Sequence, residues 1–207
     1  MLLFGLYLLR IISMKLKDIA DISSGRTFKN GVPESDEPTH SVIQLRDFDK
    51  ENDQRPITWE QLNKTDLSAS KVDNSLKADD VLIVAKGPSK KAIYLSTVPN
   101  NVVATQHFFV IRVSKDNPIS PSFLAYYLNS SEAQRWMLDN SGGSYQNAMS
   151  KKVLSELPVP DINTEQQELI TEAANSVKTE ILLYQKLIKG RKQEIDSVFK
   201  GIWKKLI

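Results

Sequence analysis

The chain has 207 residues, of which 41% are hydrophobic and 25% are charged, as in an ordinary globular protein. It contains no cysteine, which excludes a disulfide framework and a thiolate zinc site. Its formal net charge of +2 is too small to indicate nucleic-acid binding by itself. A chain without cysteine suits a reducing compartment, so we expect a cytoplasmic protein.

The first 13 residues, MLLFGLYLLRIIS, are apolar except for Arg10. They are too short to span a bilayer, which takes about 20 residues, and they lack the basic start of a signal peptide, so no membrane association is expected. Met14 begins an amphipathic segment that continues to Ile22. We interpret residues 1–13 as an upstream extension; the alternative is a segment packed on the domain or on a partner.

Residues 14–160 have the pattern of one α+β domain. Apolar runs bounded by Gly, Pro or Asn predict strands at residues 41–48, 81–85, 92–95, 102–105 and 108–113, with an extended piece around Ile57. Residues 67–76 have the pattern of a helical turn. Ser120 followed by Pro121 is typical of a helix start, and we expect helices at 123–128, at 132–138 and from Ser150. Polar loops are expected at residues 26–39 and 140–147.

Residues 161–207 form a second unit, a long helix that begins at Asn163 or Thr164 and extends about 65 Å. Its apolar positions step by four and three, which is the heptad pattern of a helix that packs against a partner helix. This seam consists of Val177, Ile181, Tyr184, Ile188, Arg191, Ile195, Val198 and Ile202. Arg191 disfavours a tight parallel homodimer, in which two guanidinium groups would meet, whereas antiparallel pairing brings Arg191 toward Glu180 or Glu194 of the other chain.

The residues offer little for catalysis. The two histidines, His40 and His107, are far apart, and no metalloprotease or hydrolase motif is present. The segment 86–90 is not a phosphate loop, because Pro88 removes an amide donor. No motif for an extruded base is present either. We therefore expect a binding module with no catalytic residue and no metal site.

Three landmarks in order resemble those of a specificity subunit of a type I restriction–modification system. The first is Leu16-Lys-Asp-Ile-Ala-Asp-Ile-Ser-Ser-Gly25, and the second is Leu76-Lys-Ala-Asp-Asp-Val-Leu-Ile-Val-Ala-Lys-Gly87. The third is Gly143-Ser144, then Leu157-Pro-Val-Pro160, then Glu165-Gln166 and Ile170. One departure is Asp79, where the family usually has glycine. A full member has two recognition domains and two long helices, so this chain resembles a half-length form.

The resemblance implies a non-catalytic subunit that reads double-stranded DNA at a bipartite site. Adenine methylation is expected in modification subunits, which bind S-adenosylmethionine, and cleavage in a restriction subunit, which uses ATP and Mg²⁺. This chain itself is expected to hold no cofactor. Its expected partners are DNA, these subunits, and a second copy of itself or another half-subunit through an antiparallel coiled coil. The competing interpretation is a coiled-coil assembly adaptor whose head binds protein.

Candidate DNA contacts follow from charge and loop chemistry. Residues 81–115 contain no acidic side chain but several basic ones, and a one-signed stretch of this kind suits a phosphate backbone. Asn and Gln side chains suit base edges in the major groove. The hypothesis comprises Arg26, Lys29, Lys86, Lys90 and Lys91 as phosphate contacts and Ser144, Tyr145, Gln146 and Asn147 on the glycine loop.

Overall fold

Strands β5 (Val81–Val84) and β8 (Phe108–Val113) form the centre of the head. The computed structural model describes residues 13–48, 57–69, 74–87, 89–141 and 148–203. With β2 (Ala20–Ser24) and β6 (Ala92–Tyr94), the two strands form an antiparallel sheet in the order β2-β8-β5-β6. Alternate side chains of β5 enter two different cores, Val81 and Ile83 on one face and Leu82 and Val84 on the other. Burial on both faces explains why this strand is continuously apolar in the sequence.

A second, three-stranded sheet covers one face of this central sheet. It contains β4 (Asn63–Thr65), β3 (His40–Ile43) and β7 (Val102–Ala104), with β3 antiparallel to β4 and parallel to β7. Two short 3-10 helices, η1 (Leu45–Asp47) and η2 (Trp59–Gln61), flank it. The core between the sheets includes Phe108, whose ring centroid lies 4.8 Å from that of Phe48.

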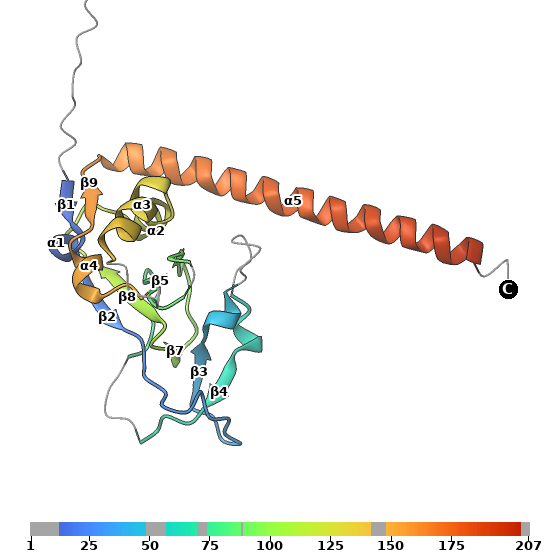
Figure 1. Cartoon of the computed structure of the whole chain (residues 1–207), viewed down its shortest axis with the longest axis horizontal. Coiled ribbons are helices and arrows are strands. Elements are labelled where there is room, and N and C mark those ends of the chain that lie inside the picture. Colours follow the sequence, from blue (N-terminus) through green and yellow to red (C-terminus); the bar gives the residue numbers. More distant parts are fainter. Residues whose placement is uncertain (1–12, 49–56, 70–73, 88, 142–147, 204–207) are drawn as a thin grey trace, which may run out of the picture.

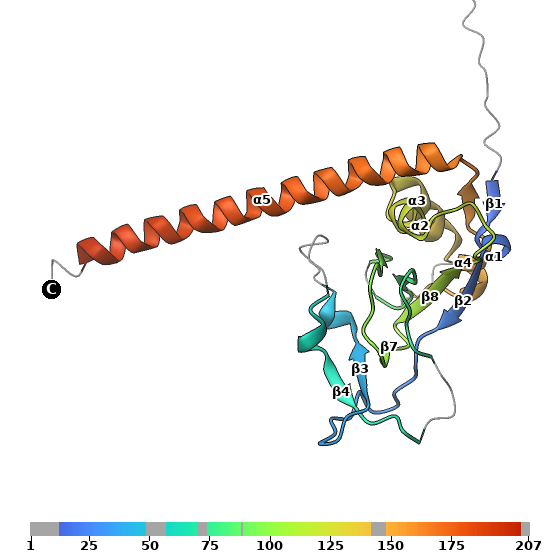
Figure 2. The ribbon, with the colours of Figure 1, turned by 180° about the vertical axis from the view of Figure 1, so that it is seen from behind.

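Four helices cover the other face: α1 (Leu16–Ile19), α2 (Pro121–Leu128), α3 (Ser131–Asn140) and α4 (Lys151–Ser155). Three of them start at a serine whose Oγ accepts a hydrogen bond from the backbone N–H three residues on. These capping residues are Ser120, Ser130 and Ser150. The helices enclose the second core, and Figures 1 and 2 show α2 and α3 beside the beginning of the long helix.

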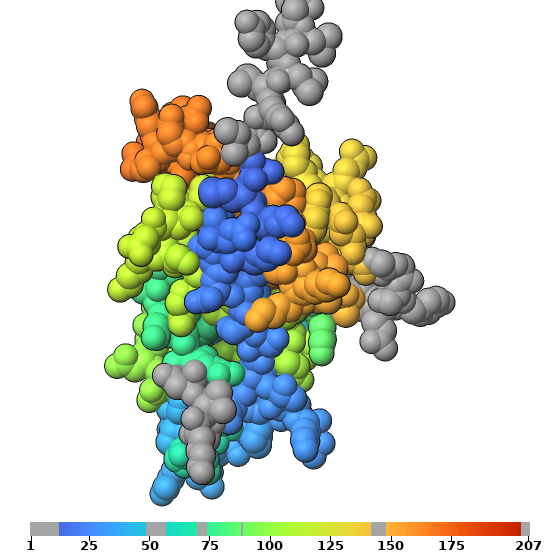
Figure 3. All heavy atoms as spheres, turned by 90° about the vertical axis from the view of Figure 1, so that its left-hand side faces the viewer, coloured from blue at the N-terminus to red at the C-terminus, as the bar shows by residue number. Residues whose placement is uncertain are grey.

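The two ends of the head meet in a small antiparallel sheet. Strand β1 (Ser13–Lys15) pairs with β9 (Pro158–Pro160), and Met14 lies opposite Val159. Figure 3 shows this blue N-terminal segment against the orange segment that precedes the long helix. Of the predicted extension, Ser13 belongs to this sheet, whereas residues 1–12 lie outside the described part of the chain.

The helix α5 (Thr164–Trp203) has 40 residues, a length of about 60 Å. Asn163 caps it: its Oδ1 accepts from the N–H of Gln166 at 2.8 Å, and its own N–H donates to Gln166 Oε1 at 3.3 Å. Figures 1 and 2 show α5 projecting far beyond the head. Its seam is therefore largely exposed, with Ile188 57% and Ile195 69% accessible. Within the described residues, no helix has the length and apolar character needed to cross a membrane.

The predicted α+β class is confirmed, while several local predictions were wrong. The helical turn expected at 67–76 is not observed in its described parts, because Asp66 accepts hydrogen bonds from both the N–H and the hydroxyl of Ser68 and forms a tight turn. The amphipathic segment from Met14 to Ile22, for which no single element was predicted, comprises the end of β1, the single turn α1 and the start of β2. The strand expected at 41–48 ends at Ile43, where η1 follows.

Candidate nucleic-acid interface

The turn at residues 104–107 brings together two predicted cations that are far apart in the sequence. The N–H of Arg26 donates to the carbonyl of Ala104 at 2.7 Å, and the N–H of Lys86 donates to that of His107 at 3.2 Å. Gly25 permits this approach, because a Cβ there would overlap the carbonyl oxygen of Thr105. The loop that begins at Arg26 and the end of β5 therefore lie on either side of the turn at residues 104–107.

Gln106 holds the loop that begins at Arg26 in place. Its Oε1 accepts from the N–H of Phe28 at 3.0 Å, and its own N–H donates to the carbonyl of Arg26 at 2.8 Å. Beneath this loop lies a hollow of about 390 Å³. It is lined by Arg26, Thr27, Phe28, Lys29, Asn30, Gly31, Pro33 and Leu67.

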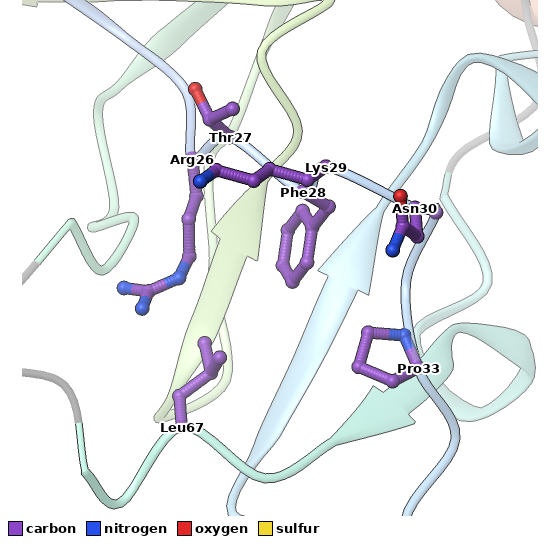
Figure 4. A pocket seen from close by; sticks show the side chains of 8 residues that line it. Arg26, Thr27, Phe28, Lys29, Asn30, Pro33 and Leu67 are labelled. Carbon is purple, nitrogen blue, oxygen red and sulfur yellow. The ribbon is translucent and has the colours of Figure 1, made fainter.

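The hollow combines two cations, polar side chains and an apolar wall. Figure 4 shows Arg26 and Phe28 extending from the loop in the direction of Leu67. Lys29 and Asn30 are exposed on the same loop. Cations of this kind suit phosphate oxygens, and the amide of Asn30 has the donor and acceptor that a base edge requires.

Lys86 lies next to the end of the glycine loop. It is exposed, and its backbone forms an antiparallel bridge with Ala148. The N–H of Met149 donates to the carbonyl of Ala85 at 2.9 Å, which fixes this contact. The predicted contacts Ser144, Tyr145, Gln146 and Asn147 lie outside the described residues, directly before Ala148.

Lys90 has a structural environment that the sequence did not indicate. Its Nζ donates to the carbonyls of Ala85 and Gly87 at 3.2 and 3.3 Å, and burial lowers the pKa of its ammonium group. The carbonyl of Lys90 in turn accepts from Gln134 Nε2 at 3.0 Å, which ties the loop to α3. Lys90 therefore braces the loop that carries Lys86, and Lys91 is half-buried beside it.

Arg112 is a further cation of the acid-free stretch and lies on β8. Its guanidinium donates hydrogen bonds to the buried carboxylate of Asp80.

The sequence analysis missed Gln106, which positions Phe28, because a glutamine in a turn gives no sequence signal of a distant partner. In the part of the chain that the structure describes, no group of three or more His, Asp or Glu side chains could hold a metal ion.

Similar proteins were found at the levels of family and fold. The chain matches the family described as type I restriction modification DNA specificity domain over residues 12–195. No curated protein matches it. One similar solved structure concerns complex assembly and conformational transition of the type I R-M system, with TM-score 0.62, 16% identity, 90% of this chain covered and 43% of that one.

Two others are S subunits. The HsdS subunit from Thermoanaerobacter tengcongensis has TM-score 0.53 and 16% identity, with 83% of this chain and 38% of that one covered. The type I restriction–modification S subunit from M. genitalium has TM-score 0.50 and 14% identity, with 86% and 43% covered. These likenesses show the fold, and the chain spans about two fifths of the length of these structures. Since the family match includes the whole described head and most of α5, the chain belongs to the type I restriction modification DNA specificity domain family.

Proposed function

We propose that this chain is a non-catalytic specificity subunit that directs adenine methylation to a bipartite DNA site, together with restriction where a restriction subunit joins. The family match over residues 12–195 supports this function and disfavours a protein-binding adaptor. The chain presents one head and one projecting helix, so two copies would supply two heads. A two-fold dimer of this kind reads two inverted half-sites separated by a fixed gap.

The exposed seam of α5 supports the dimer. Burying one isoleucine side chain stabilises a complex by roughly 1.5–3 kcal/mol, and the seam carries Ile181, Ile188, Ile195 and Ile202. Arg191 is 80% exposed and lies 2.7 Å from Glu194 of its own helix. An antiparallel partner would place Ile181 opposite Arg191 and bring Glu180 of the partner subunit to the same level. Arg191 would then remain paired with a carboxylate inside the dimer.

The absence of cysteine allows a direct test of this pairing. Single substitutions Ile181→Cys, Ile188→Cys and Ile195→Cys each introduce one unique thiol. In an antiparallel dimer with this register, the thiols at positions 181 and 195 lie too far from their own copies to form a disulfide, whereas a parallel dimer cross-links at both positions. A monomeric mass together with no cross-link at any position would contradict the dimer.

The catalytic groups are assigned to partner subunits. In this proposal the modification subunits bring S-adenosylmethionine, and a restriction subunit brings ATP and Mg²⁺. This chain contributes DNA contacts through the turn at 104–107 and the loops around it. The complex would act in the cytoplasm, where it has access to the chromosome.

Methylation-aware sequencing tests the proposed function most directly. The modification-subunit genes are expressed with and without this chain, and the methylated adenines of the host DNA are mapped. We expect a bipartite methylated motif that depends on this chain. The same set of motifs in both samples would reject the function, and no mobility shift with random duplexes would favour the adaptor instead.

A further inference from the structure

Gln167 is the one buried residue of α5 among residues 164–203, all of which the structure describes, and it is 1% exposed. Its Oε1 accepts from the N–H of Ser120 at 2.8 Å. Its Nε2 donates to the carbonyls of Pro118 and Ile162 at 3.1 and 3.0 Å. The amide thus uses its oxygen and both of its N–H groups.

The three bonds join the starts of two helices. Pro118 and Ser120 lie within three residues of the start of α2, while Ile162 lies two residues before the start of α5. One side chain in the first turn of α5 therefore connects the segment that leads into α5 with the segment that leads into α2. An apolar side chain of the same size would leave a partly buried backbone N–H and two carbonyls without these bonds.

The other contacts between α5 and the head are made mainly along α2. Ile162 and Ile170 pack partly buried against the head core, whereas Leu169 on another side of the helix is 69% exposed. From Gln167 to Trp203 the helix extends roughly 55 Å. A tilt of about 5° at Gln167 would displace the far end by about 5 Å, which exceeds the base-pair step of about 3.4 Å.

We propose that Gln167 is a positioning residue that fixes the angle between the head and α5 and thereby sets the DNA spacer that two heads accept. The spacer part of this inference depends on the proposed function. The angle part does not, because it follows from the hydrogen bonds of a single chain. Directional hydrogen bonds suit this role better than apolar contacts, which permit sliding.

The test measures the angle and the spacer separately. Fluorophores or spin labels are attached at two exposed positions, Lys64→Cys on β4 and Ser197→Cys on α5. The doubly labelled chains are mixed with excess unlabelled chains, so that the measured distances are those within one chain. The variants are Gln167→Leu and Gln167→Glu, which retains an acceptor for Ser120 but has no donor. Gln166→Leu is the matched control, since Gln166 is exposed and its side chain accepts a hydrogen bond from the N–H of Asn163.

In the wild type and in Gln166→Leu we expect the same narrow distance distribution. In Gln167→Leu and Gln167→Glu we expect a shifted, broader one, with the near-ultraviolet circular dichroism of the head retained. With DNA, the Gln167 variants should lose the preference for one spacer length while keeping wild-type affinity for a single half-site. A wild-type distance distribution in whichever Gln167 variant folds would overturn the inference. A wild type that binds no DNA would reject the proposed function and the spacer role, while the distances would still decide the angle.

Discussion

Arg112 donates two hydrogen bonds to the buried carboxylate of Asp80, from Nε to Oδ1 and from Nη2 to Oδ2, both at 2.7 Å. The same carboxylate accepts from the N–H of Lys77 at 2.8 Å. Asp80 is fully buried, while the side chain of Arg112 is 45% exposed. The pair joins the start of β5 to β8 and so stabilises the head. Arg112 therefore contributes less to a DNA-facing surface than its position in an acid-free stretch indicated.

Replacing Arg112 with methionine should destabilise the head by about 3 kcal/mol, because a buried carboxylate would lose its charged partner. Denaturant unfolding measures this change. The double variant Asp80→Asn with Arg112→Met should recover much of the loss, since the neutral amide costs less to bury. Equal unfolding midpoints for Arg112→Met and the wild type would contradict this account.

Asp79 occupies a turn that requires a left-handed backbone, with φ of 70°. Its side chain accepts from the hydroxyl of Tyr94 at 2.7 Å, and burial together with this bond raises the pKa of Tyr94 to about 12. The turn therefore keeps the geometry expected for the glycine usual in the family. Asp79→Val should destabilise the head by about 1–3 kcal/mol, whereas Asp79→Gly should be close to neutral, as measured by thermal unfolding. An equal loss of stability in Asp79→Val and Asp79→Gly would show that the hydrogen bond from Tyr94 contributes more than backbone strain.

The sequence predicted those elements whose signal is local. The continuous apolar run of β5 and the strand β8 were located almost to the residue, and the Ser120–Pro121 pair marked the start of α2. The heptad pattern predicted a long helix, which is α5, while the packing of its seam against a partner helix stays a prediction. Each of these features depends on residues within a few positions of one another.

Features that depend on distant partners could not be predicted. The pairing of Met14 with Val159, and the hydrogen bonds that Gln106 and Gln167 make, join segments separated by much of the chain. A glutamine has no periodicity or spacing that distinguishes a buried, fully bonded side chain from an exposed one. The third landmark of the family resemblance included Gln166 and Ile170 but not Gln167, the side chain that anchors α5.

Glu156 should give the protein a component of acid sensitivity. Hydrogen bonds from Lys15 and Lys17, each at 2.6 Å, lower the pKa of its carboxyl from 4.5 to about 2. Because the folded-state pKa lies below the unfolded one, the stabilisation is present above pH 4.5 and is lost as the pH falls toward 2. Glu156→Gln should therefore lower stability at pH 7 and have no effect near pH 2, in denaturant unfolding at both values. An equal effect at both values would show that the charge is not responsible.

Lys86 should contribute a phosphate contact that does not depend on sequence. Lys86→Ala should weaken binding to all duplexes alike and reduce the slope of log K against log salt by about 0.9. Lys115→Ala is the matched control, because Lys115 is an exposed lysine that follows the other end of β8. An unchanged slope in Lys86→Ala, or an equal change in both variants, would remove Lys86 from the interface. Lys90→Ala is a poorer probe, since it also removes the bonds to Ala85 and Gly87.

Ile188 lies in the middle of the seam and is 57% exposed in the single chain. Ile188→Glu should leave the head intact, as followed by its thermal unfolding, but should weaken self-association. Two isoleucines are lost from each dimer, at roughly 1.5–3 kcal/mol each, so the dissociation constant should rise by about 10²- to 10⁴-fold in sedimentation equilibrium. Lys189→Glu, the exposed neighbour outside the seam, should dimerise like the wild type apart from a small effect of charge. If Ile188→Glu associates as tightly as Lys189→Glu, the seam does not join two copies, and the two heads are not spaced by α5.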